Sequence, residues 1–221
     1  MAFPISPKKQ GGFSVSEILI LPEKTKVDVL VPLYEPQKNG WINCEMSLKT
    51  IPEYCRVLAR DDTESKQGFT RNVNELLKMS SAPYILVLNQ DTEITPGYVE
   101  ALISRMKASP RAAVVSGQVR DIVERKAITW GGSGPCYPVG IHKVGYEGSL
   151  DKPTREPWIT FVAPLIRRET LIEVGLLDPN LVQIYSDSDW CLRARAFGWE
   201  CWYEPKVIIY HKGNVSQTTS P

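Results

Sequence analysis

Side chains that can bind a metal or a phosphate-bearing ligand stand directly after apolar runs at four places in the sequence. These places hold, in chain order, Pro32, Tyr34 and Glu35; Asp61 and Asp62; Asn89, Gln90 and Asp91; and His211. Carboxylate oxygens favour Mg²⁺ or Mn²⁺, and Mg²⁺ usually takes one or two ligands from the protein and the rest from phosphate and water. If the runs are neighbouring strands, this pattern predicts a metal site with a phosphate group as co-ligand.

The runs themselves have the composition of buried strands. Short apolar, β-branched stretches occur at 27–31, 54–59, 84–88 and 112–115. Helical stretches at 71–79 and 96–107 separate them, the second with Thr95 as the expected N-cap. This alternation predicts an α/β fold with a mostly parallel sheet, in which ligands bind beyond the carboxyl ends of the strands.

The second half of the chain is less regular. The glycine- and proline-rich stretch 131–140 predicts a loop, and the apolar stretch 158–166 predicts a strand that enters a helix at 168–174. Helical spacing at 187–197 ends at Gly198, and a last strand is expected over 202–211. Arg167 and Arg168 are expected to be solvated charges.

Each of these residues also has an ordinary structural interpretation. Paired aspartates after a strand are often turn formers, and Asn-Gln-Asp is a common loop sequence. A histidine at a strand end is often a surface residue, and His142 lies in a loop and receives little weight. Asp187 and Asp189, before an amphipathic helix, fit an N-cap and a first-turn carboxylate. Only the order of the motifs along the chain favours a functional interpretation.

Composition limits the classes of protein that fit. The 221 residues, 43% hydrophobic and 23% charged, are typical of one globular domain, and a formal net charge of +1 argues against nucleic acid as a partner. Five cysteines without a CxxC pair indicate reduced thiols, most of them buried. The longest apolar run near the start, 18–21, is too short for a membrane span or a signal peptide, so a cytoplasmic location is expected.

Five motifs in one order resemble the family-2 glycosyltransferases, particularly their rhamnosyltransferase-like branch. They are VDVLVPLYE, then ARDDTES, then QGFTRNVNELL with APYILVLNQDTEITPGYVEAL, then WITFVAPLIRRETLIEVGLLD, and last YSDSDWCLRARAFGWECWYEPKVIIYH. The likeness runs from about residue 27 to about residue 216. It implies a GT-A fold, with a Rossmann-like, mostly parallel sheet flanked by helices and a smaller acceptor-side region.

The resemblance also implies a reaction, in which a sugar moves with inversion from a nucleoside diphosphate (UDP or dTDP type) to an acceptor hydroxyl, on a glycan. Mn²⁺ or Mg²⁺ would neutralise the diphosphate, with Asp91 and His211 as ligands. Asn89 stands where the family often has an aspartate, so it is assigned to ribose or water. Asp187 is the expected general base and Asp189 the alternative, because Ser186 replaces the usual neighbouring glutamate.

Further residues are assigned by the same resemblance. The nucleotide would contact Pro32, Tyr34, Glu35, Asp61, Asp62, Arg71, Asn89, Gln90 and Asp91. The acceptor would contact Trp130, Gly131, Gly132 and Trp158, although both tryptophans fit core anchors equally well.

The expected organisation is a leader over 1–25 and one GT-A domain over 26–221. Within the domain, a nucleotide-binding half covers about 26–116 and an acceptor half about 117–216. The chain would be a minimal GT-A unit or a module of a larger polypeptide. The alternatives are a catalytically weak relative that binds nucleotide or glycan, suggested by Asn89 and Ser186, and a nucleotidyltransferase, which would have no use for Asp187.

Overall fold

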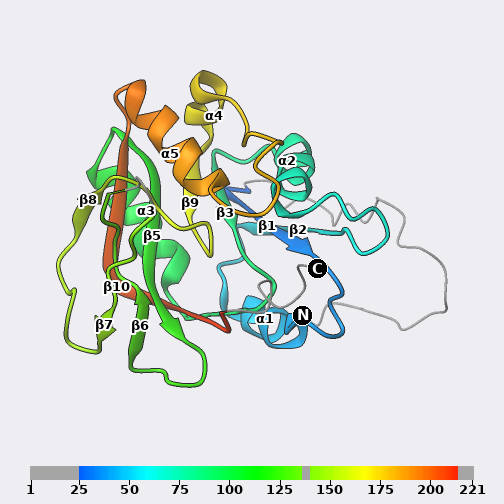
Figure 1. Cartoon of the computed structure of the whole chain (residues 1–221), viewed down its shortest axis with the longest axis horizontal. Helices are drawn as coiled ribbons and strands as arrows, with labels where there is room; N and C mark the ends of the chain where they lie inside the picture. The colour runs from blue at the N-terminus through cyan, green and yellow to red at the C-terminus, as the bar shows by residue number, and fades with distance from the viewer. Residues whose placement is uncertain (1–24, 136–139, 214–221) are drawn as a thin grey trace.

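One mixed β-sheet organises the protein (Figure 1). The computed structural model describes residues 25–135 and 140–213, so almost all of the expected leader lies outside the described residues. The order along the sheet is β2-β1-β3-β9-β5-β10-β4. Strands β2, β1, β3, β5 and β10 run in one direction, and β9 runs opposite between β3 and β5. The expected mostly parallel central sheet is therefore confirmed.

The strands occupy the following residues: β1 Val27–Leu33, β2 Cys55–Asp61, β3 Tyr84–Val87, β4 Thr92–Ile94, β5 Ala112–Asp121, β6 Ala127–Trp130, β7 Gly145–Tyr146, β8 Thr154–Glu156, β9 Leu165–Arg167 and β10 Glu200–His211. The helices are α1 Trp41–Ser47, α2 Phe69–Met79, α3 Tyr98–Ala108, α4 Arg168–Val174 and α5 Ser186–Ala196, with a 3₁₀ turn at Leu48–Thr50. Helix α2 packs on β1 and β2, α3 on β5, β9 and β10, and α5 on β10 and α4.

The predicted elements all occur, and the differences lie at their boundaries. Helix α3 begins at Tyr98 after Gly97, so Thr95 is not its N-cap; the Thr95 hydroxyl instead donates to the Ile208 carbonyl of β10 at 2.6 Å. Of the stretch 158–166, only its end forms a strand, β9. The short strands β4, β6, β7 and β8 pair at the sheet margins, where two to four residues give little periodicity.

Cysteine usage agrees with the expectation for reduced thiols. Cys44, Cys191 and Cys201 are buried, Cys55 is partly buried, and all four are free. Cys136 lies outside the described residues.

A buried ion pair holds the edge of the parallel sheet. Asp28, the second residue of β1, is fully buried and receives two bonds from the Arg56 guanidinium, at 2.7 and 2.9 Å. The backbone N–H groups of Ser81 and Ala82 also donate to it. Burial raises the pKa of Asp28, but these four donors outweigh it, and the net pKa is lowered.

Arg167 and Arg168 were expected to be solvated, and that expectation is wrong. Arg167 is largely buried and donates to the carbonyls of Ala112 and Met106 at the end of α3. Arg168 donates to the Ala82 carbonyl and lies 4.0 Å from the Asp28 carboxylate. Both guanidiniums satisfy backbone carbonyls that the sheet and helix ends leave open, a use that local sequence does not reveal.

We expect Asp28→Ala to lower the free energy of unfolding by about 3–5 kcal/mol, because it leaves the Arg56 charge and two N–H groups without their partner. Urea denaturation at pH 7 measures the loss. Glu75→Ala, which removes an exposed pair with Lys78, serves as the control and should change stability by about 0.5 kcal/mol or less.

Because the folded pKa of Asp28 is lowered, the contribution of Asp28 to stability is complete above about pH 4 and disappears as pH falls through that folded pKa. A loss under about 1 kcal/mol at pH 7 would contradict this account.

Candidate active site

The carboxyl ends of β1 and β3 form a topological switch point. From β1 the chain crosses to β2 on one side, and then to β3 on the other side of β1. The two crossovers leave in opposite directions, and in such sheets ligands bind at this point, outside the carboxyl ends of the strands. Four of the predicted nucleotide residues lie here: Tyr34 follows β1, and Asn89, Gln90 and Asp91 follow β3.

Gln90 joins the two strand ends directly. Its side-chain oxygen accepts from the Tyr34 N–H at 2.9 Å, and its side-chain nitrogen donates to the Tyr34 carbonyl at 2.7 Å. Asn39 donates to the same carbonyl at 2.9 Å. The backbone of Tyr34 is thereby fixed while its ring stays exposed. Pro32, in contrast, is buried within β1.

Asp91 and His211 are in contact where β4 pairs with the end of β10. The His211 Nε2 lies 3.2 Å from the Asp91 Oδ1, and both side chains are mostly but not fully buried. Strand β4 pairs with the end of β10 and brings the two together, and Gly40 sits so close that a Cβ there would lie 3.4 Å from the Asp91 Cα. A carboxylate beside an imidazole is a suitable pair of ligands for Mn²⁺ or Mg²⁺.

Asn89 carries an unsatisfied acceptor beside this pair. Its backbone N–H donates to Val162 at 2.9 Å, and its carbonyl accepts from Thr92 at 2.6 Å. Its side-chain oxygen, however, is buried and has no hydrogen-bond partner among the described residues. A buried acceptor without a partner is costly in a folded protein, so it points to a ligand that would satisfy it.

Asp61 and Asp62 shape the loop after β2. Asp61 accepts from the Thr63 N–H at 2.9 Å, and Thr63 in turn accepts from the Glu35 N–H at 2.8 Å. Buried Asp62 accepts from the Gly68 N–H at 2.8 Å and from Arg60. These bonds fit the turn-forming alternative, and they also hold both carboxylates at the carboxyl end of β2.

Asp187 lies in a mostly buried position at the start of α5. Burial raises the pKa of its carboxyl, and hydrogen bonds from the N–H groups of Ser188, Phe161 and Asp187 itself, with the charge of His142, offset only part of the rise. A carboxylate with a raised pKa is suited to accept a proton near neutral pH.

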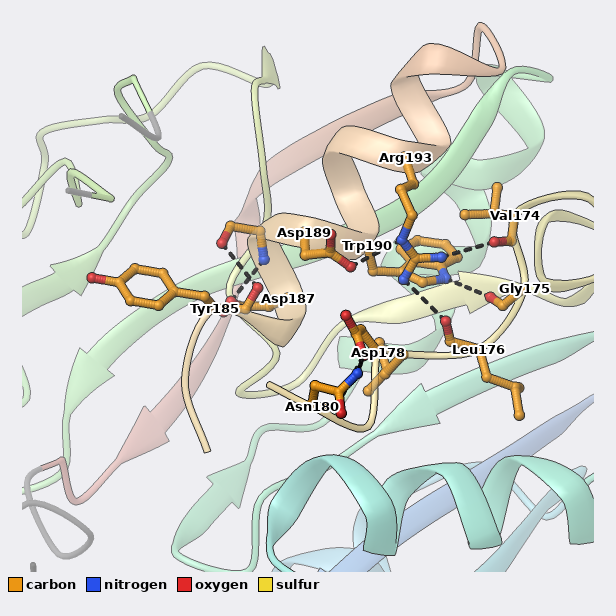
Figure 2. Close-up of polar contacts among 12 residues, drawn as sticks. Val174, Gly175, Leu176, Asp178, Asn180, Tyr185, Asp187, Asp189, Trp190 and Arg193 are labelled. Carbon is orange, nitrogen blue, oxygen red and sulfur yellow. Dashed lines mark hydrogen bonds and ion pairs between the residues drawn. The ribbon is translucent and has the colours of Figure 1, made fainter. Parts of the chain in front are cut away.

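Asp189, the alternative base, is engaged by its own helix. Its carboxylate accepts from Arg193 Nε at 2.9 Å, and Arg193 also donates to the carbonyls of Val174 and Leu176 (Figure 2). Trp190 donates to the Gly175 carbonyl at 2.9 Å. Asp189 therefore belongs to the contacts that join α5 to the end of α4, and Asp187 remains as the carboxylate suited to proton transfer.

Residues 159–162 connect Asp187 to the strand-end cluster. The Phe161 N–H donates to Asp187, and the next residue, Val162, accepts from the Asn89 N–H at 2.9 Å. Ile159 donates its N–H to the Cys191 sulfur of α5 at 3.4 Å. One short segment thus places the expected base beside the expected metal and nucleotide residues.

The residues assigned to the acceptor lie in a closely packed hairpin. Trp130 and Trp158 are 1% and 3% exposed, and both indole N–H groups donate within the protein, to Ser133 and to the Gly134 carbonyl. Gly131 and Gly132 are also buried, and a Cβ on Gly132 would lie 2.8 Å from the buried Glu156 carboxylate. This burial favours core anchoring for both tryptophans, the alternative left open by the sequence.

Arg71 points toward the loop that precedes α5. It is exposed on α2, donates to the Pro179 carbonyl at 3.3 Å, and lines a pocket with Gln67, Asn74, Glu75, Lys78, Leu176, Leu177 and Pro179. Asn74 exchanges two hydrogen bonds with the Leu177 backbone. Helix α2 therefore braces the loop that leads to Asp187.

Two residues near Asp187 were not predicted as site residues: His142 received little weight, and Tyr185 was not considered. The His142 and Trp158 rings lie 5.3 Å apart at an angle of 49°, His142 forms an isolated antiparallel bridge with Ser133, and its charge lowers the pKa of Asp187. Tyr185 immediately precedes α5. His142 is one of only two histidines in the chain, and that scarcity is the signal that could have drawn attention to it.

The sequence and the fold are both similar to those of known glycosyltransferases. The model of glycosyl transferase family 2 matches residues 51–174, more than half of the chain. An N-acetylglucosaminyl-diphospho-decaprenol L-rhamnosyltransferase of Mycobacterium tuberculosis is 25% identical over 146 residues in each of two strains, CDC 1551 / Oshkosh and ATCC 25618 / H37Rv. The alignment covers 59% of this chain and 48% of the relative, so the chain spans about half of that protein.

Solved structures show the same fold at low identity. A GalNAc-T7 structure with UDP, GalNAc and Mn²⁺ gives a TM-score of 0.63 at 11% identity, covering 86% of this chain and 44% of its own. The mannosyltransferase PcManGT of Pyrobaculum calidifontis, with GDP-Man and Mn²⁺, gives 0.59 at 13% identity, covering 87% and 58%. S. aureus TarS (residues 1–349) gives 0.55 at 15% identity, covering 81% and 60%. The fold of the chain is GT-A.

The described residues contain neither a three-residue cluster of metal ligands nor a helix suited to cross a membrane. Residues 25–135 and 140–213 hold no group of three or more His, Cys, Asp or Glu side chains arranged for a metal ion. Within the same ranges, no helix has the length and apolar character that a membrane crossing requires.

Because the folded pKa of Asp187 is raised, its charge should cost stability at neutral pH. Between the unfolded pKa of about 3.9 and the higher folded value, the folded state binds more protons, so stability falls as pH rises. We therefore expect Asp187→Asn to be more stable than the unmodified protein at pH 7, with the gain shrinking toward about pH 4. Urea denaturation across this range, with Asp189→Asn as control, measures it. Equal effects of Asp187→Asn at all pH values would rule out the buried charge as the cause.

Proposed function

The chain belongs to glycosyl transferase family 2, and we propose that it moves a sugar, with inversion, from a nucleoside diphosphate of the UDP or dTDP type to a hydroxyl of a glycan acceptor. The observation that carries this proposal is the contact between Asp91 and His211, together with the segment that holds Asp187: Phe161 donates to Asp187, and the next residue, Val162, accepts from Asn89. In this scheme residues 26–116 hold the donor, and the later half of the chain supplies the base and the acceptor contacts.

The donor set at the strand ends fits a divalent ion. Asp91 and His211 would hold Mn²⁺ or Mg²⁺, and the unsatisfied oxygen of Asn89 would meet the ion's water or the ribose. When bound, the ion supplies positive charge against the developing negative charge of the leaving diphosphate. Two protein ligands are enough for an ion that shares its shell with phosphate oxygens.

Asp187 would perform the proton transfer. As the acceptor oxygen attacks the anomeric carbon, its proton passes to the Asp187 carboxylate, and the bond to the diphosphate breaks on the opposite face. The N–H groups of Ser188 and Phe161 would hold the carboxylate in place, and burial would raise its affinity for the proton. Tyr34, Glu35, Asp61, Asp62 and Gln90 would contact the nucleotide, with Arg71 a further donor-side contact.

The curated relatives guide the choice of substrates. They are N-acetylglucosaminyl-diphospho-decaprenol L-rhamnosyltransferases. We therefore propose a rhamnosyl nucleotide as the first donor to test and an N-acetylglucosaminyl glycoside as the first acceptor. The alternative function, a relative that binds nucleotide or glycan with weak catalysis, is favoured by Asn89 and by the buried Ser186, because neither can supply a carboxylate.

The reaction is tested with UDP, dTDP and GDP sugars and Mn²⁺, by measuring release of the nucleoside diphosphate with and without acceptor. We expect Asp187→Asn to lower the transfer rate by roughly 10²–10⁴-fold, because the amide cannot accept the proton from the acceptor hydroxyl. Asp189→Asn is the matched control and should stay within about threefold, since a partly exposed pair with Arg193 stabilises little. Donor binding by the unmodified protein without turnover of any donor would support the weak-catalysis alternative.

Metal use is tested at Asp91. We expect Asp91→Asn to weaken Mn²⁺ binding by about tenfold or more, because it removes the charged ligand from a site with few protein ligands. Electron paramagnetic resonance of free Mn²⁺ in the presence of a nucleoside diphosphate reports binding independently of turnover. Glu93→Gln, whose carboxylate pairs with Arg125 at 2.7 Å, is the control two residues away. Equal Mn²⁺ affinity of both variants would remove Asp91 from the metal site.

A further inference from the structure

The acceptor side of the proposed site requires a surface that a sugar can contact. Aromatic rings suit this purpose because their faces pack on the apolar C–H faces of sugar rings, while hydroxyl groups remain free for hydrogen bonds. The two tryptophans assigned from the sequence do not offer such a face, because both are almost fully buried. The sugar-binding surface therefore requires another aromatic residue, exposed and close to Asp187.

Tyr185 meets this requirement. It lies two residues before Asp187, its side chain is 45% exposed, and Figure 2 shows its ring pointing away from Trp190 and Arg193. Val182 and Ile184 of the same loop are also exposed, at 40% and 65%. Exposed apolar side chains that lie close in sequence to a mostly buried carboxylate are typical of ligand sites.

The backbone of Tyr185 is held in an uncommon conformation. Its φ is +66°, in the left-handed region that bulky residues seldom adopt. The Tyr185 carbonyl accepts from the Asp189 N–H at 2.9 Å and from the Ser188 hydroxyl at 3.1 Å, which fixes the turn at the start of α5. Asparagine or glycine would form this turn with less strain, so the structure itself gives no reason for an aromatic side chain here.

The loop before Tyr185 is fixed to the donor side of the protein. The Thr70 N–H of α2 donates to the Val182 carbonyl at 3.1 Å, and the Thr70 hydroxyl donates to Leu181. Gly68 lies so close that a Cβ there would come within 2.4 Å of the Val182 side chain. Tyr185 is therefore presented from a braced loop, whose position is set before an acceptor arrives.

We propose that Tyr185 is the acceptor-binding platform of this protein, against which the ring of the acceptor sugar packs while its hydroxyl reaches Asp187. This inference rests on the proposed function and adds to it the residue that selects a sugar-bearing acceptor. Tyr185 replaces Trp130 and Trp158 in that role, and these two keep the hairpin core together.

The test separates the ring from the backbone. Tyr185→Asn keeps a residue that tolerates positive φ and removes the ring, whereas Tyr185→Phe keeps the ring. Tyr146→Asn is the matched control, because Tyr146 is an exposed tyrosine on β7, away from α5. Two quantities are measured for each variant: donor hydrolysis without acceptor, and the KM for an N-acetylglucosaminyl glycoside in the transfer reaction.

We expect Tyr185→Asn to raise the acceptor KM at least tenfold with donor hydrolysis within twofold of the unmodified protein. Tyr185→Phe should stay within threefold in both, and Tyr146→Asn should change neither. An acceptor KM of Tyr185→Asn within twofold of the unmodified value overturns the proposal, and so does an equal rise in Tyr185→Phe and Tyr185→Asn.

A binding measurement keeps the inference separate from the reaction. Saturation-transfer NMR with methyl N-acetyl-β-D-glucosaminide as the probe reports sugar contact whether or not any donor is turned over. A signal from the unmodified protein that Tyr185→Asn loses and Tyr185→Phe retains supports the platform, even if transfer fails and the proposed function falls. Equal signals from all three proteins, or none from the unmodified protein, overturn the platform.

Discussion

The candidate site depends on the backbone of one segment, Ile159 to Arg167. Its last residues form β9, the antiparallel strand that lies between β3 and β5 and so joins β2-β1-β3 to β5-β10-β4. Its middle residues, Phe161 and Val162, bond to Asp187 and Asn89. Because backbone hydrogen bonds have narrow geometry, this segment sets the spacing between the residues that would bind the donor and the carboxylate that would take the proton.

Much of the fold could be predicted from the sequence because its central strands and longer helices have strong periodicity. The contact between Asp91 and His211 was also predictable, since Asp91 follows β3 and His211 ends β10 in one sheet. The sequence could not reveal that Trp130 and Trp158 are buried, because an indole ring suits a core and a sugar equally well. Nor could it separate Asp187 from Asp189, because that distinction arises from Arg193 and the carbonyls of Val174 and Leu176, which only the tertiary structure brings together.

The electrostatics of the protein are local, in keeping with its formal net charge of +1. Asp28 is a fully buried carboxylate and Asp187 a mostly buried one, and the pKa values of the two groups shift in opposite directions. Four donors, two of them from Arg56, lower the pKa of Asp28, whereas Asp187 keeps a raised pKa despite its backbone donors. The first arrangement stabilises the sheet, and the second costs stability at neutral pH, as expected of the proton acceptor that we propose.

The absence of a side chain at Gly68 has a consequence beyond its own loop. Helix α2 can approach Val182 closely only because nothing projects from this position, and the same loop carries Tyr185 and Asp187 into place. Any larger residue at 68 must push the loop outward, and the displacement would be passed on to Tyr185 and Asp187. Under the proposed function the donor and acceptor sites would therefore be mechanically linked, because a displacement on one side would shift the alignment of the other.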